Sequence, residues 1–112
     1  MREKLQHEVG EIIRLLVDRQ FDKIAALTNG VRLPAKQMQS AVEQYGRTLV
    51  VPPSDAFELM DVVEVREKQP SQWSITMPLW TKEEGRSDLS IEVTIVQGTD
   101  KFHIELDDIH VL

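Results

Sequence analysis

Apolar residues recur every three or four positions through the first 46 residues, the period of helices that bury one face. The first helix is predicted over residues 2–17, where charged residues flank the apolar positions. Its face is expected to comprise Leu5, Val9, Ile12, Ile13, Leu16 and Val17. Shorter helices are predicted at 22–30, with Asp22 available as a cap, and at 34–46. Gly46 is suited to end the last of them.

Beyond residue 56 the pattern changes to alternation of apolar and polar residues, which is typical of strands with one buried face, although Met60 and Asp61 disturb the phase of the first run. The four alternating runs are Phe57, Leu59, Val63 and Val65; Trp73, Ile75, Met77 and Leu79; Leu89, Ile91, Val93 and Ile95; and Phe102, Ile104 and Leu106. Short turns between them predict an antiparallel meander. The expected fold is therefore α+β, a single domain over 1–112. Two to three helices at about 2–46 pack on one face of a four-stranded sheet at about 56–110.

The turn between the last two runs predicts their register. A two-residue hairpin loop at 98–99 would pair inward residues with inward residues along both strands. The same count places Glu92 opposite Glu105, and Leu89 opposite Asp108, so the outer face is expected to be wet and acidic. Like charges directly opposite each other cost up to about 1 kcal/mol unless a cation relieves them. Relief by a nearby lysine and relief by a basic partner both remain open.

Charge is distributed unevenly along the chain. The net charge is −6, but residues 1–50 carry +2 and residues 51–112 carry −8. Clustered cations are absent from the second half, so nucleic-acid binding is not expected there. No apolar stretch is long enough to span a membrane, and the charged N-terminus lacks the core of a signal peptide. The chain has no cysteine, which agrees with a cytoplasmic location.

A charged loop follows the second strand run. Glu83, Glu84 and Asp88 surround one cation, Arg86, and Gly85 is suited to a turn. One interpretation is a structural turn in which Arg86 ties the loop to the last strand. The other is a recognition edge formed together with the acidic residues near the C-terminus. Trp80 borders the loop, either as an exposed interface anchor or as a residue that the loop covers.

Few residues are arranged for catalysis. The sequence lacks a nucleophile elbow and a glycine-rich phosphate loop, so no enzymatic activity is expected. His110 is the best general-base candidate, and Asp61 is either turned outward by a bulge or directed into a pocket. The alternation of His103, Glu105 and Asp107 contains metal-ligand types, but three residues along one strand rarely converge on a point. No metal or other cofactor is predicted.

Three stretches carry a family resemblance: "YGRTLVVPP" at 45–53, "LWTKEEGRSDL" at 79–89 and "IELDDIHVL" at 104–112. With them the chain resembles a family of small bacterial proteins of unknown function, and that resemblance implies no activity or catalytic residue. The order of helices followed by a sheet also resembles, in outline, the nuclear transport factor 2-like and cystatin-like folds.

The favoured hypothesis is a non-enzymatic acidic module that binds a basic protein, such as an immunity protein that neutralises a basic bacterial toxin of the nuclease type. The candidate partner-binding residues are Trp80, Glu83, Glu84, Arg86, Asp88, Glu92, Glu105, Asp107 and Asp108. The alternative is a pocket between helices and sheet that binds a small apolar ligand, with Asp61 or His110 as acid or base. A homodimer through a sheet edge is a third hypothesis.

Overall fold

The computed structural model describes residues 1–29 and 32–111, and it confirms the α+β class with the helices first. Three α-helices, α1 (Arg2–Val17), α2 (Phe21–Thr28) and α3 (Ala35–Tyr45), precede the sheet. The remaining elements are β1 (Leu49–Val50), the 3-10 helix η1 (Ser54–Leu59), β2 (Asp61–Glu64), β3 (Gln72–Thr81), β4 (Gly85–Gln97) and β5 (Phe102–Val111). The ends predicted for α2 and α3 are close to those observed. Asn29 and Gly46 take the left-handed conformation, while Gly30 lies outside the described residues.

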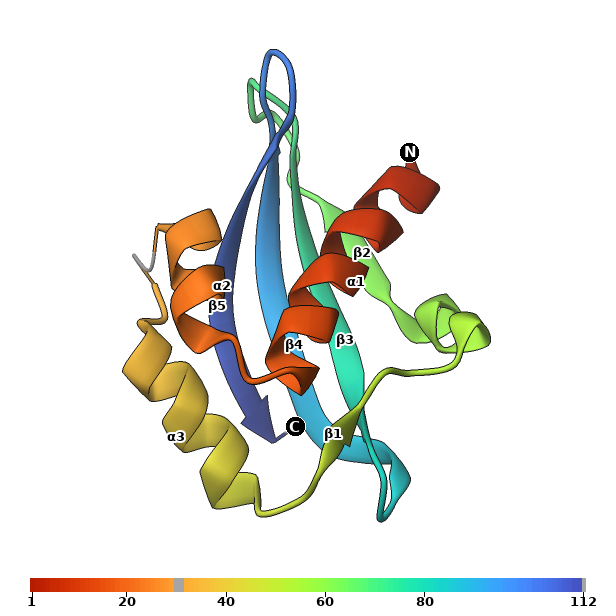
Figure 1. The fold of residues 1–112 in the computed structure, drawn as a ribbon. Helices are drawn as coiled ribbons and strands as arrows, with labels where there is room; N and C mark the ends of the chain where they lie inside the picture. Colours follow the sequence, from red (N-terminus) through yellow and green to blue (C-terminus); the bar gives the residue numbers. More distant parts are fainter. Residues whose placement is uncertain (30–31, 112) are drawn as a thin grey trace.

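The sheet is antiparallel throughout, and β2, β3, β4 and β5 follow one another in chain order as the predicted meander (Figure 1). The prediction of four strands was wrong by one. Leu49 and Val50 form the short strand β1, which pairs with Thr81 and Trp80 of β3. Strands β1 and β2 therefore share the same edge of β3.

The core lies between the helices and one face of the sheet. Figure 1 shows α1 lying across this face, with α2 and α3 beside β5. The buried residues of α1 are Leu5, Val9, Ile12, Ile13 and Leu16, as the helical period predicts. The alternating faces predicted for β3 and β4 are confirmed, because Trp73, Ile75, Met77, Leu79, Leu89, Ile91, Val93 and Ile95 are all buried. The other face of the sheet carries polar residues such as Thr76, Ser90 and Glu92, together with Val63 and Pro78.

The segment 56–65 departs from the predicted strand. Residues 54–59 form η1, and the guanidinium of Arg2 donates hydrogen bonds of 3.0 Å and 2.8 Å to the carbonyl oxygens of Phe57 and Met60. Strand β2 begins only at Asp61. Val63 was predicted to face the core, but it is 54% exposed, because Val62 is the residue opposite the inward Ile75.

The predicted register between β4 and β5 was wrong. Gln97 faces Phe102, so the loop contains residues 98–101 rather than two residues. Gly98 allows this turn, because a Cβ there would lie 2.2 Å from the carbonyl oxygen of Lys101. The loop shifts the pairing by two residues, which keeps inward residues opposite inward residues.

A second irregularity moves the end of β5 by one further residue. Thr94 faces Glu105, whereas Glu92 faces Asp108, so the strand contains a β-bulge at Asp107. The bulge reverses the alternation, and Ile109 is buried opposite Ile91. Consequently the predicted pairs Glu92–Glu105 and Leu89–Asp108 do not form.

Candidate functional site

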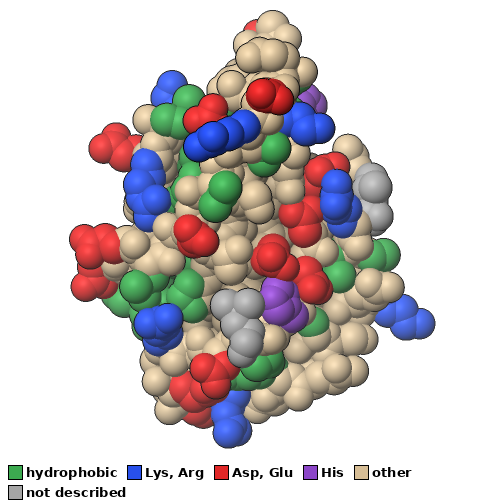
Figure 2. Space-filling view, turned by 180° about the vertical axis from the view of Figure 1, so that it is seen from behind, with side chains coloured by type: hydrophobic (Ala, Val, Ile, Leu, Met, Phe, Trp, Pro, Cys, Tyr) green, Lys and Arg blue, Asp and Glu red, His purple; other side chains and the backbone are tan. Residues whose placement is uncertain are grey.

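A row of polar residues crosses the sheet on the face that the helices leave open. Asp61 of β2 faces Thr76 of β3, Thr76 faces Glu92 of β4, and Glu92 faces Asp108 of β5. We call these four residues the acidic row. Neighbouring strands lie about 4.8 Å apart, so three carboxylates fall on one line across the face. Figure 2 shows Asp and Glu side chains around a histidine near the middle of this face.

His110 lies at the β5 end of the acidic row. Its Nδ1 atom is 3.2 Å from Oδ2 of Asp108 and 3.4 Å from Oε2 of Glu92. The histidine side chain is 30% exposed, but Nδ1 itself is covered and makes no hydrogen bond. Glu92, Asp108 and His110 are the described residues whose ligand-type atoms converge, all within 4.8 Å of one another. Sequence analysis did not bring these three residues together.

A hollow of about 390 Å³ adjoins the acidic row on the same face. Asp61, Arg86 and Asp88 line it, together with Thr76, Pro78 and Ser90. Asp61 therefore points outward, which is one of the two alternatives that the sequence left open. Asp61 and His110 do not lie in a pocket between helices and sheet, since both are on the opposite face.

The charged loop between β3 and β4 is held by the end of α3 and the residues after it. Glu83 accepts hydrogen bonds of 2.9 Å from both the backbone N–H and the hydroxyl of Thr48. Glu84 accepts a hydrogen bond of 2.9 Å from the Tyr45 hydroxyl and lies 3.6 Å from Arg47. These two carboxylates therefore have partners within the chain. The structural interpretation of the loop is favoured, although the expected tie through Arg86 to β5 is replaced by these contacts.

The backbone hydrogen bond from Thr48, and then its hydroxyl, hold the pKa of Glu83 below its ordinary value. A lowered pKa in the folded state stabilises the protein above the unfolded value of about 4.3, and this contribution is lost as the pH falls. Glu83→Gln should therefore destabilise the chain at pH 7 and have less effect near pH 3. Urea unfolding of both proteins at the two pH values measures the difference.

The matched control for this experiment is Glu58→Gln. Glu58 is exposed on η1, and its carboxylate makes no hydrogen bond among the described residues. The control variant is expected to follow the natural chain at both pH values. Equal destabilisation by Glu83→Gln at pH 7 and near pH 3 would show that the charge of Glu83 contributes nothing.

Trp80 and Arg86 face each other across β3 and β4 near this loop. Trp80 is partly buried and packs against the core, so the alternative of a fully exposed anchor does not hold. The pairing of β3 and β4 is irregular between Pro78 and Trp80, where the Ser87 hydroxyl donates a 2.8 Å hydrogen bond to the carbonyl oxygen of Leu79. Arg86 has no ion pair within residues 1–29 and 32–111, and its side chain lines the hollow.

Glu105 and Asp107 lie at the β5 edge. Arg32, from the connection between α2 and α3, lies 3.5 Å from Glu105 and 3.4 Å from Asp107. The Thr94 hydroxyl donates a 2.6 Å hydrogen bond to Asp107 Oδ2. His103, Glu105 and Asp107 therefore do not converge on one point at which a metal ion could bind. Instead, Glu105 and Asp107 fasten the helical connection to the sheet.

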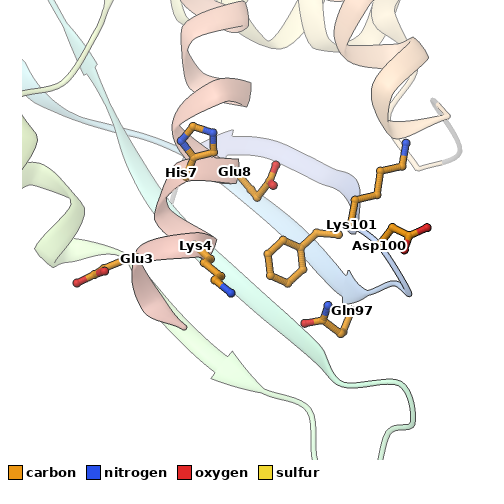
Figure 3. A pocket seen from close by; sticks show the side chains of 8 residues that line it. Glu3, Lys4, His7, Glu8, Gln97, Asp100 and Lys101 are labelled. Carbon is orange, nitrogen blue, oxygen red and sulfur yellow. The ribbon is translucent and has the colours of Figure 1, made fainter.

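A further hollow, of about 490 Å³, lies between the start of α1 and the β4–β5 hairpin. Figure 3 shows Lys4 and Gln97 extending into it from the two sides, while Glu3, Asp100 and Lys101 point away. The charged groups around it diverge rather than converge on one point. The acidic row therefore remains the surface on which chemically related side chains gather.

The fold and this surface define the class of the protein: a small α+β domain with helices on one face of an antiparallel sheet and an acidic row on the other. The chain belongs to the family described as "Domain of unknown function (DUF7668)", whose model matches residues 13–112. No curated protein and no solved structure matches the chain. None of the described helices is both long enough and apolar enough to cross a membrane.

Proposed function

We propose that the chain is a non-enzymatic protein-binding module whose acidic row docks against a basic partner. The observation that carries this proposal is the row itself. Asp61, Glu92 and Asp108 lie on a helix-free face, and none of them pairs with Lys or Arg within residues 1–29 and 32–111. Residues 51–112 as a whole carry a net charge of −8, which has the same sign as the charge of the acidic row.

Electrostatic complementarity explains why such a surface favours a basic protein. Carboxylates on one face that have no Lys or Arg partner attract a protein rich in Lys and Arg, accelerate its encounter and repel acidic proteins. The hollow between Asp61 and Asp88 offers a recess for one long basic side chain. A cytoplasmic immunity protein that neutralises a basic bacterial toxin, such as a nuclease, has this chemistry.

The contacts in the structure change how much each candidate residue is expected to contribute to partner binding. Glu83 and Glu84 contribute less, because their carboxylates already have partners in the chain. Asp61 moves from the alternative pocket to the docking face. The docking surface proposed here comprises Asp61, Arg86, Asp88, Glu92 and Asp108, with Trp80 at its margin. Glu105 and Asp107 contribute less for the same reason as Glu83 and Glu84, because Arg32 already pairs with both. The alternative apolar pocket is disfavoured, since Asp61 and His110, its proposed acid or base, lie on the face of the sheet opposite the helices.

Binding to a panel of purified bacterial nuclease toxin domains of high isoelectric point tests the proposal. We expect the chain to bind and inhibit a basic member, with an association rate that falls as salt is added. The double variant Asp61→Lys with Asp88→Lys should reduce that rate at least tenfold, because it reverses the charge beside the hollow. Biolayer interferometry measures the rate, and cleavage of a fluorescent oligonucleotide measures inhibition.

The matched control is Asp18→Lys with Asp22→Lys, which changes the net charge equally on the exposed helical side. It should alter the association rate far less than the variant on the sheet face. Equal losses from the two double variants would show that net charge alone matters. Binding restricted to acidic members of the panel would contradict the proposed partner class.

A further inference from the structure

The β-bulge at Asp107 determines which side chains face outward at the end of β5. In an unbroken strand, Asp108 and His110 would share the inward face with Leu106. With the extra residue, Ile109 takes the inward position, and Asp108 and His110 turn outward. There they meet Glu92, which projects from the middle of β4. Three ligand types thus come together from two rigid strands.

The distances in this cluster are those of neighbouring ligands around one metal ion. Bonds of about 2.0–2.1 Å from a tetrahedral Zn²⁺ to nitrogen and oxygen place adjacent ligand atoms roughly 3.3 Å apart. His110 Nδ1 lies 3.2 Å from Asp108 Oδ2 and 3.4 Å from Glu92 Oε2. A small cation at their centre would reach all three atoms without a large movement of the backbone.

The hydrogen bonding of His110 is the second, independent observation. Both carboxylate oxygens lie within hydrogen-bond distance of Nδ1. They do not lie in the direction that a hydrogen bond to Nδ1 requires, so Nδ1 makes no hydrogen bond. Nδ1 is also covered from solvent, so water does not replace the missing partner. A covered nitrogen that makes no hydrogen bond is costly, and a metal ion between His110 and the two carboxylates would accept a lone pair from each of the three groups.

We propose that Glu92, Asp108 and His110 form a binding site for one first-row divalent cation such as Zn²⁺. Imidazole nitrogen together with two carboxylates suits Mn²⁺ to Zn²⁺, whereas Mg²⁺ and Ca²⁺ prefer oxygen ligands alone. Three protein ligands leave further coordination positions open to solvent, since Glu92 and Asp108 are 42% and 50% exposed. The site does not depend on the proposed protein partner, and its test uses the isolated chain.

Isothermal titration of the tag-free chain with ZnCl2 tests the site. We expect one ion per chain, and at least tenfold weaker binding in each of two variants, His110→Ala and Glu92→Gln. Both side chains are on the open face, and circular dichroism verifies that the variants fold. The matched control is His103→Ala, which removes an exposed histidine of the same strand and should keep the affinity of the natural chain.

Paramagnetic Mn²⁺ locates the ion independently. Added in substoichiometric amounts, it should broaden the amide resonances of residues 90–92 and 108–110 before others. The proposal is overturned by the absence of saturable Zn²⁺ binding, by a less than tenfold effect of His110→Ala, or by an equal effect of His103→Ala. Broadening centred elsewhere on the chain would overturn it as well.

Discussion

Replacing Ile91 with Ala is expected to lower the free energy of unfolding by about 2–5 kcal/mol. Ile91 is fully buried at the centre of β4, where Met77 and Ile109 face it from the two neighbouring strands. Truncation removes buried apolar surface and leaves a cavity that rigid strands cannot close. For a chain of about this length, each 1 kcal/mol corresponds to roughly 4–8 °C in the midpoint of thermal unfolding. Urea and thermal unfolding measure the loss.

Val63→Ala is the control for Ile91→Ala. Val63 lies on the outer face of β2 and is 54% exposed, so its truncation should change stability by less than about 0.5 kcal/mol. The pair tests which face of the sheet is buried, on which the acidic row depends. Comparable losses from the two variants would show that the assignment of faces is wrong.

Deleting Asp107 is expected to cost more than about 4 kcal/mol, or to prevent folding. Without the bulge, alternation would direct Asp108 and His110 into the core and expose Ile109, which is now 4% exposed. Burying two ionisable side chains while exposing an isoleucine is unfavourable on both counts. Slippage of β5 would avoid this only by breaking the pairing with β4. Urea unfolding followed by circular dichroism measures the result.

The control for the deletion is Asp107→Ala, which retains the chain length and therefore the bulge. It removes the hydrogen bond from Thr94 and the ion pair with Arg32, so we expect a loss of about 1–3 kcal/mol. A deletion no more destabilising than this substitution would mean that the extra residue does not determine which way the end of β5 faces.

Most of the fold could be predicted from the periodicity of the apolar residues, because each element buries one face. In α1 and in β3, the buried residues repeat at the helical or strand period without interruption, so the pattern in the sequence is also the pattern of burial. The segment 54–60 was mistaken for a strand, because Phe57 and Leu59 imitate alternation. The two prolines just before it and the carbonyl contacts of Arg2 favour a 3-10 helix instead.

Register was less predictable, because it depends on loop length and on the bulge rather than on alternation. Both a two-residue loop and a four-residue loop after Gln97 keep apolar residues together, so burial alone does not distinguish them. The bulge did leave a signal in the sequence. Leu106 and Ile109 are three residues apart, which breaks the period of two followed by Phe102 and Ile104. That phase change places His110 on the outer face, which it shares with Glu92, but only the four-residue loop brings the two residues side by side.

Helix α1 leaves the ribosome before the strands against which it packs. Its apolar face lies against the sheet (Figure 1), and β3, β4 and β5 are synthesised 55 or more residues after the helix ends. At a translation rate of about 5–20 residues per second, the apolar face of α1 stays uncovered in the nascent chain for at least about 3 s. During translation, we expect this helix to be available to chaperones until the strands emerge.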